Sequence, residues 1–119
     1  MRVHHIALRT RDVGRLASFY ADVLGLAITR RDDARGSVWL DADGTIVMIE
    51  RAEEGEPTIG PGSMELVAFA ADAAEVARWK TSALAAHGIA LEAETAFTVY
   101  FRDPDGRRVA LSSYERELI

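Results

Sequence analysis

Apolar and polar residues alternate over residues 3–9, which is the period of a half-buried β-strand. Apolar residues then recur at helical spacing from Leu16 to Leu24, and this pattern predicts a helix that Asp12 caps and Gly25 ends. Three further strands are expected at 27–31, 37–40 and 45–50, with Asp43-Gly44 as the hairpin turn between the last two. The first half of the chain therefore predicts the order strand, helix, strand, strand, strand.

The second half of the chain predicts the same order of elements. A strand is expected at 64–70 and a helix from about 73 to 87, behind a capping Asp72. Short strands are expected near 89–92, 98–102 and 107–112. Between the halves, residues 52–62 hold three Gly and two Pro without periodicity, and this composition indicates a linker.

The two halves form an internal repeat. The segment from His5 to Asp12 lies 60 residues before the segment from Glu65 to Asp72, and residues 41–44 lie 62 before residues 103–106. Matching segments in the same order at a nearly constant offset predict an α+β fold of two βαβββ modules. We expect one domain over 1–119, with module one at about 1–51, the linker at 52–62, module two at about 63–113 and a tail at 114–119.

Strand alternation decides which side chains share a surface. In the first strand, Ile6 and Leu8 form an apolar face that we assign to the helices, and His5, Ala7 and Arg9 form the other face. A face that mixes ionisable and apolar groups suits a concave binding surface.

The same alternation is applied to the first strand of module two. Leu66 and Ala68 are assigned to the helix side, whereas Glu65, Val67 and Phe69 are assigned to the binding side. This assignment places Glu65 on the same kind of surface as the residues around position 5.

The third predicted strand carries an aromatic residue, Trp39. The repeat pairs it with Phe101, and Trp39 is therefore expected to pack beneath a helix. By alternation, Val38 and Leu40 would then line the binding side.

Composition narrows the classes of function. The chain has 119 residues, a mass of 13.0 kDa and a formal charge of -5, with basic residues in pairs at most, which argues against nucleic-acid binding. It has no cysteine, so any metal would have nitrogen and oxygen ligands. No apolar run reaches the roughly 20 residues of a membrane span, and no signal-peptide pattern opens the chain, so a cytoplasmic protein without membrane contact is expected.

Three segments carry a resemblance to a known family. They read His-Ile-Ala-Leu-Arg-Thr-Arg-Asp at 5–12, Leu-Ala-Ser-Phe-Tyr-Ala-Asp-Val-Leu-Gly-Leu at 16–26, and Tyr-Phe-Arg-Asp-Pro-Asp-Gly at 100–106. With the repeat, they resemble the glyoxalase I, fosfomycin-resistance, bleomycin-resistance and extradiol-dioxygenase superfamily, also called vicinal oxygen chelate proteins. The resemblance implies a mixed sheet curled around a cavity with the helices on its outer face, and it implies a homodimer.

The resemblance also implies a divalent metal, held at four positions that read His5, Met48, Glu65 and Ala110 here. Met48 and Ala110 stand where a Glu is common, and neither suits a hard divalent ion. Glu50 lies two residues beyond Met48, about 7 Å further along the strand, and a small shift could bring it to the ligand position. His5, Glu50 and Glu65 would then form a site for zinc, nickel, manganese or iron.

A cavity without metal is the alternative reading of the same residues. In this reading, Glu50 is only a charged strand end before an acidic linker, and Glu65 is a carboxylate paired with Arg9 or Arg102. Both readings leave a polar cavity, and they differ in whether its carboxylates bind a metal.

Four residues are expected to contact a small-molecule substrate. Tyr100 and Thr98 match positions at which the fosfomycin-resistance relatives contact substrate. Arg102 could bind an anionic group with two parallel hydrogen bonds, and Val38 would line the cavity by strand alternation.

The predicted function is a glyoxalase-like metal enzyme of lyase or isomerase type that acts on a small oxygenated metabolite. The metal would polarise a carbonyl or hydroxyl oxygen, and Glu50 or Glu65 would serve as general base. The alternative is a metal-free protein of the bleomycin-resistance type, which binds and sequesters a small molecule.

Overall fold

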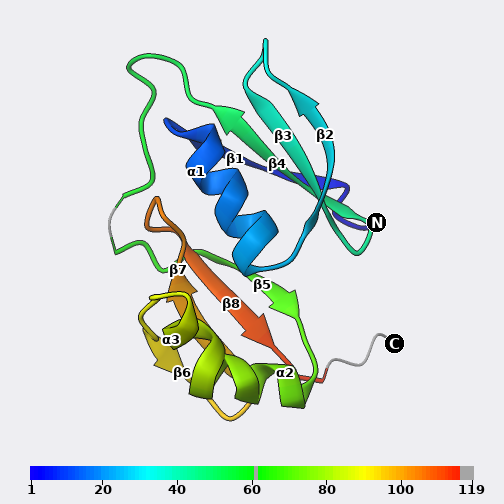
Figure 1. Ribbon diagram of the computed structural model, residues 1–119, viewed down its shortest axis with the longest axis vertical. Helices are drawn as coiled ribbons and strands as arrows, with labels where there is room; N and C mark the ends of the chain where they lie inside the picture. Colours follow the sequence, from blue (N-terminus) through cyan, green and yellow to red (C-terminus); the bar gives the residue numbers. More distant parts are fainter. Residues whose placement is uncertain (61, 116–119) are drawn as a thin grey trace. The chain divides into compact units, whose positions relative to one another are not determined.

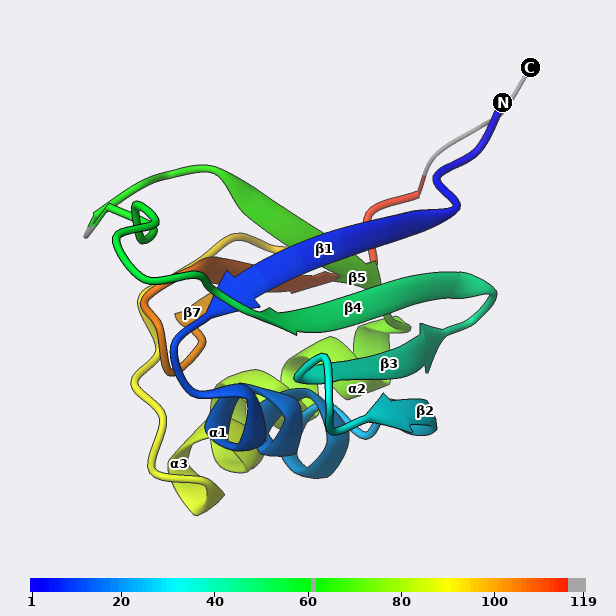
Figure 2. The ribbon, with the colours of Figure 1, turned by 90° about the horizontal axis from the view of Figure 1, so that it is seen from above.

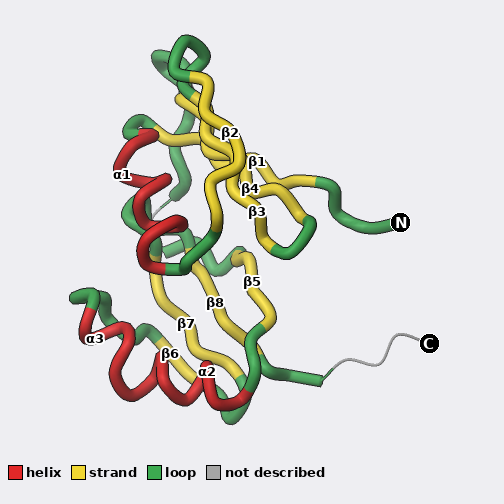
Figure 3. The backbone as a smooth tube through the Cα atoms, turned by 45° about the vertical axis from the view of Figure 1, so that its right-hand side comes forward, coloured by secondary structure: helices red, strands yellow, loops and turns green. Residues whose placement is uncertain are grey.

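The computed structural model describes residues 1–60 and 62–115, so the predicted tail lies outside the described residues from position 116 onward (Figure 1). The chain divides into two compact units, Met1–Thr58 and Ile59–Ile119, and each unit builds its own four-stranded sheet. In Figure 3, a helical segment (red) follows the first strand (yellow) along the chain in both units, and the remaining strands come after it. The predicted α+β fold with two βαβββ modules is confirmed.

The first unit has one mixed sheet, in the order β1-β4-β3-β2. β1 runs parallel to β4, whereas β4 with β3 and β3 with β2 are antiparallel. The elements are β1 (His5–Thr10), α1 (Val13–Ser18), η1 (Phe19–Val23), β2 (Ala27–Asp32), β3 (Ser37–Ala42) and β4 (Thr45–Arg51).

α1 begins at a side-chain cap, as the sequence predicts. The Asp12 carboxylate accepts a hydrogen bond of 3.1 Å from the amide of Arg15. The helix continues without a break into η1, a π-helical turn, and buries Leu16, Phe19 and Tyr20. In Figure 2, α1 lies along one face of the sheet, where it contacts β3 and β4.

The second unit repeats this topology in the order β5-β8-β7-β6, again with one parallel pair, β5 and β8. β6 is shorter than expected and begins later, because the amide of Ile89 still closes the preceding helix on the carbonyl of Leu84. The elements are β5 (Leu66–Ala70), α2 (Ala73–Arg78), η2 (Trp79–Ala83), α3 (Leu84–Ala86), β6 (Ala93–Glu94), β7 (Thr98–Arg102) and β8 (Arg108–Ser112).

The helix of the second unit covers an apolar sheet face. Trp79 stacks on Phe101 with ring centroids 5.5 Å apart, and both side chains are buried. Val99 and Val109 are fully buried on the same face, so this cluster is the core of the unit. None of the helices in the described part of the chain is long and apolar enough to cross a membrane.

Strand pairing overturns the predicted faces in β3. Trp39 pairs with Met48, on the face away from α1, whereas Val38 and Leu40 are buried on the core face. The repeat misled here because the two hairpins differ in length. The first connection is Asp43-Gly44, with both residues at positive φ, whereas the second has five residues, 103–107, between the paired Arg102 and Arg108.

The same error affects β5. Val67 pairs with Val109 and lies on the core face, so Leu66 and Ala68 lie on the open face, opposite to the prediction. Glu65 precedes the strand, and by alternation its position belongs to the core-side parity. The capping residues Asp12 and Asp72 are 60 residues apart, whereas β1 and β5 begin 61 residues apart, at His5 and Leu66, so one residue fewer separates the start of β5 from its helix cap.

Candidate functional site

The open face of the second sheet forms a pocket of about 500 Å³. β5, β7 and β8 supply its floor, and the segments around residues 95–97 and 114 supply its rim. None of the side chains that line it is charged. They are Leu66, Ala68, Thr95, Phe97, Thr98, Tyr100, Ala110, Ser112 and Tyr114.

Hydroxyl groups on the pocket floor are fixed by one another. The Thr98 and Ser112 hydroxyl oxygens lie 2.8 Å apart and share a hydrogen bond. The Ser112 hydroxyl also accepts a hydrogen bond of 3.2 Å from the amide of Tyr114. Thr98 itself is buried, so this pair is a positioned polar group within an otherwise apolar wall.

Two exposed aromatic rings stand at the rim. Phe97 and Tyr114 pack edge to face, with ring centroids 5.4 Å apart. Phe97 is nevertheless 49% exposed and Tyr114 is 69% exposed. The amide of Ser113 donates to the carbonyl of Phe97 at 2.8 Å, which ties the segment after β8 to the loop before β7. Exposed rings of this size, held by backbone contacts, are suited to cover a bound molecule.

Tyr100 is held against a cation on the same sheet face. The Arg108 guanidinium lies 4.1 Å from the centre of its ring. Arg108 in turn contacts Glu92 at 3.3 Å, and Glu92 also accepts two hydrogen bonds from Arg102, at 2.6 and 2.9 Å. Hydrogen bonding from Arg102 lowers the pKa of Glu92, so the carboxylate stays ionised between the two arginines.

Arg102, which we predicted to bind an anion, already forms hydrogen bonds with other residues of the chain. Besides Glu92, it donates to the carbonyls of Ser63 at 2.7 Å and Gly106 at 3.1 Å, and it reaches the sulfur of Met64 at 3.9 Å. These contacts take up all five N–H donors of the guanidinium. An anionic ligand would have to displace one of them.

The strand register identifies the residues that stand at the family's metal positions. Ala7 pairs with Met48 in the first unit, and Ala68 pairs with Ala110 in the second. The counterpart of His5 in β5 is therefore Leu66, two residues before Ala68. The four positions read His5, Met48, Leu66 and Ala110, and only one of these side chains is a ligand for a hard divalent ion.

The two predicted carboxylate ligands lie elsewhere. Glu50 pairs with Arg9 in the strand register, four residues beyond the partner of His5, which is about 13 Å along the strand. It also forms an ion pair of 3.6 Å with Arg9. Glu65 is exposed before β5, and its backbone amide donates to the Ser63 hydroxyl at 3.3 Å.

The residues present do not fit a metal centre. Among residues 1–60 and 62–115, no three His, Asp or Glu side chains gather closely enough to hold an ion. The His5 ring is exposed and contacts His4, with a distance of 2.9 Å between their Nδ1 atoms.

The sequence reasoning overlooked Phe97, Ser112 and Tyr114. Val38 is buried on the core face and lines a smaller cavity of the first unit instead of this pocket. Phe97 lies in the short connection between β6 and β7, which is a weak signal. The contact of Tyr114 with Phe97 joins residues 17 apart and follows only from how β8 lies beside β7.

The chain was compared with known families and structures. The sequence profile of the Glyoxalase/Bleomycin resistance protein/Dioxygenase superfamily matches residues 2–111. No curated protein sequence matches the chain.

Solved structures of similar fold include a lactoylglutathione lyase from Agrobacterium tumefaciens, with 26% identity, a TM-score of 0.74 and coverage of 93% of this chain and 92% of that one. A glyoxalase/dioxygenase from Nostoc punctiforme has 26% identity, a TM-score of 0.73 and coverage of 92% and 88%. A mutant of the fosfomycin resistance protein FosX from Listeria monocytogenes, in complex with Mn(II) and 1S,2S-dihydroxypropylphosphonic acid, has 17% identity, a TM-score of 0.75 and coverage of 94% and 89%.

The ion pairs of Arg9 generate a prediction on pH. Arg9 donates two hydrogen bonds to Glu56, at 2.7 and 3.0 Å, and they lower the pKa of Glu56 from 4.5 to about 2. Because the folded-state pKa lies below the unfolded-state value, this contact stabilises the fold at neutral pH, and its contribution is lost as the pH falls from about 4.5 towards 2. A carbon-13 NMR titration should give a Glu56 carboxyl midpoint near 2.

Two variants control that measurement. Arg9→Gln should return the Glu56 pKa towards 4.5, whereas Arg35→Gln, which removes an equal charge from an exposed ion pair in the same unit, should leave it unchanged. A wild-type midpoint near 4.5 would show that the Arg9 contact does not form in solution.

Proposed function

Because the chain belongs to the glyoxalase/bleomycin resistance protein/dioxygenase superfamily, we propose that it binds a small organic molecule in the uncharged pocket of its second unit, without a metal ion at the superfamily positions. The observation that carries this proposal is the composition of the pocket floor. Leu66 and Ala110 stand where metal ligands are expected, and Ala110 is fully buried beneath the open face. This is the binding and sequestering function that the sequence left as its alternative.

The pocket favours a neutral ligand with an aromatic ring. Its volume of about 500 Å³ is within the range of small-molecule sites. Three rings face or flank it, from Phe97, Tyr100 and Tyr114. A charged ligand would find no counter-ion among the lining side chains, whereas an aromatic ring would gain stacking contacts at little cost in desolvation.

We assign separate parts to the predicted substrate residues. The Thr98 and Ser112 hydroxyls would bind a polar atom of the ligand, and the ring of Tyr100 would form one wall. Arg102 would act as a positioning residue, because its contacts join β7 to the segment before β5. Val38 would not contact this ligand, because it is buried in the first unit and does not line the pocket of the second.

A metal-dependent lyase or isomerase is the second candidate. The 26% identity to a lactoylglutathione lyase over most of both chains favours it, as does the exposed His5 at the start of β1. In this candidate His5, Glu50 and Glu65 would be the ligands, for zinc, nickel, manganese or iron, and one carboxylate would be the general base. The separation of Glu50 from His5 along the strand argues against it.

The superfamily resemblance also supports a homodimer as part of the proposal. Sedimentation equilibrium should then give twice the 13.0 kDa chain mass. A mass of one chain across the concentration range would remove this part of the proposal and leave the pocket unaffected.

The ligand proposal is tested with N-phenyl-1-naphthylamine, an uncharged aromatic probe whose fluorescence rises in apolar sites. Saturable binding is expected, and Phe97→Ala should weaken it about tenfold, since an aromatic contact contributes about 0.5–1.5 kcal/mol beyond buried area. Leu91→Ala is the matched control, because Leu91 is 41% exposed in the same unit and does not line the pocket. Equal weakening by both variants, or no saturable binding, would contradict the proposal.

The metal question is tested by equilibrium dialysis against zinc, nickel, manganese and iron(II), each alone. The donor set predicts no stoichiometric binding. If one equivalent binds and both His5→Ala and Glu65→Gln abolish it, the second candidate replaces the first. Glu54→Gln serves as the control for a general loss of negative charge, because Glu54 is exposed outside the strands.

A further inference from the structure

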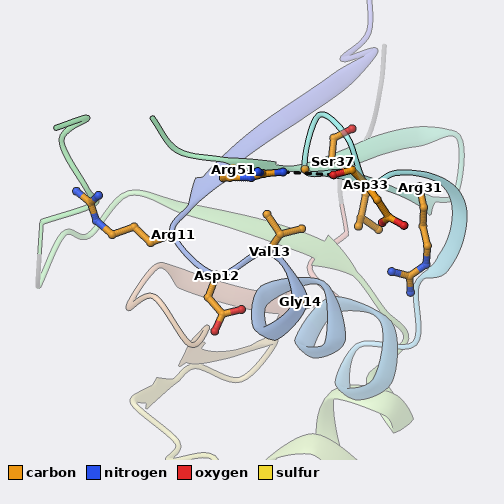
Figure 4. A pocket seen from close by; sticks show the side chains of 10 residues that line it. Arg11, Asp12, Val13, Gly14, Arg31, Asp33, Ser37 and Arg51 are labelled. Carbon is orange, nitrogen blue, oxygen red and sulfur yellow. Dashed lines mark hydrogen bonds between the residues drawn. The ribbon is translucent and has the colours of Figure 1, made fainter. Parts of the chain in front are cut away.

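A second cavity, of about 330 Å³, lies in the first unit where α1 begins. Three arginines from three different segments line it: Arg11 follows β1, Arg31 belongs to β2 and Arg51 ends β4. In Figure 4, Arg51 lies above the first turn of α1, Arg31 lies on the other side of Asp33 from Arg51, and the side chain of Arg11 points away from both. Neither the superfamily positions nor the pocket of the second unit includes these residues.

These arginines differ from most others in the protein in having no carboxylate partner. Among the described residues, Arg9, Arg35, Arg78, Arg102, Arg107 and Arg108 each form an ion pair with Asp or Glu. Within the same described ranges, none of the three at this cavity does so. Arg11 and Arg51 donate only to backbone carbonyls, those of Glu56 at 2.9 Å and Asp33 at 3.4 Å. Their charge is therefore not neutralised by a side chain in direct contact.

The position of Arg51 is fixed by the hairpin beside it. Its amide donates to the carbonyl of Gly36 at 2.9 Å, and its guanidinium lies against the Gly36 backbone, where a Cβ atom would overlap it. Gly36 is at a φ of 65°, in the left-handed region that favours glycine. Gly36 thus leaves room for the guanidinium at the cavity wall, where it donates to the carbonyl of Asp33 at 3.4 Å.

The start of α1 completes the cavity wall. Asp12 caps the amide of Arg15 with its side chain and that of Leu16 with its carbonyl, so the helix cap leaves the amides of Val13 and Gly14 to other acceptors. Both residues line the cavity. Asp12 and Asp33 line it too, and three arginines against two aspartates leave one net positive charge.

From this arrangement we propose that the cavity binds a phosphate group, either as free phosphate or as the phosphate of a small monoester. The Arg51 and Arg31 guanidinium groups bind its oxygens, and the amides of Val13 and Gly14 donate to the remaining oxygens. The net charge of the lining suits a small anion and would repel a cation. The site is independent of the uncharged pocket in the second unit, so neither proposal requires the other.

The test is a proton–nitrogen NMR titration of the full chain with inorganic phosphate, and with glycerol 3-phosphate in a second arm, at constant ionic strength. The amide signals of Val13 and Gly14 should shift with saturation, at a dissociation constant of about 1–10 mM as expected for exposed side chains. Tighter binding of the ester would identify a monoester as the preferred ligand, and equal binding would identify the phosphate group alone.

Variants separate a site from general charge attraction. Combined Arg31→Gln and Arg51→Gln should weaken phosphate binding at least about tenfold, whereas Arg35→Gln, whose side chain is 86% exposed and outside the cavity, should leave it unchanged. Gly36→Ala keeps the net charge but displaces Arg51, so it should also weaken binding, with a thermal melt to verify folding. Shifts that chloride reproduces at equal ionic strength, or equal weakening by Arg35→Gln, would overturn the proposal.

Discussion

The parallel pairing of β5 with β8 is the constraint on which the rest of the site depends. It sets Ala68 opposite Ala110 and Val67 opposite Val109, and strand alternation then sorts every neighbouring side chain onto one face or the other. Because Val67, Val109 and Phe101 face the helix, the core beneath Trp79 is apolar. A shift of one residue would expose this core and bury the opposite face, so the register is fixed by the burial of apolar area as well as by backbone hydrogen bonds.

That register determines the chemistry of the open face. It places small and apolar residues at the centre, a hydroxyl pair at one edge and aromatic rings at the rim. Of the charged groups nearby, Arg102 and Arg108 share one carboxylate, that of Glu92, which lies between them. The resulting surface can bind an uncharged ring and has no ligands with which to hold a metal ion. The first unit differs, because Arg11, Arg31 and Arg51 line a cavity there and form no ion pair with a carboxylate among the described residues.

Much of the fold could be predicted from local patterns. The helix cap at Asp12 and the glycine turns each depend on a few neighbouring residues and were predicted correctly, as was the order of the five elements in each half, although β6 begins after the segment predicted for it. The faces of β3 and β5 could not be predicted, because they depend on the exact number of residues between corresponding strands of the two modules. The caps suggested an offset of 60 and the turns 62, whereas β1 and β5 correspond at 61. Because the offset of the strands is one residue longer than the caps suggested, Leu66 and not Glu65 stands at the expected metal position. The contact of Phe97 with Tyr114 depends on tertiary packing and left no pattern in the sequence.

Measuring the register of β5 against β8 tests most directly whether Leu66 or Glu65 stands at the expected metal position. In a methyl-labelled sample, nuclear Overhauser effects across this strand pair report which residue faces Ala110. The structure predicts a strong effect between the methyl groups of Ala68 and Ala110, with Val67 facing Val109. An effect between Val67 and Ala110 in place of the first would contradict it, because that pairing makes Glu65 the counterpart of His5 and returns a carboxylate to the metal position.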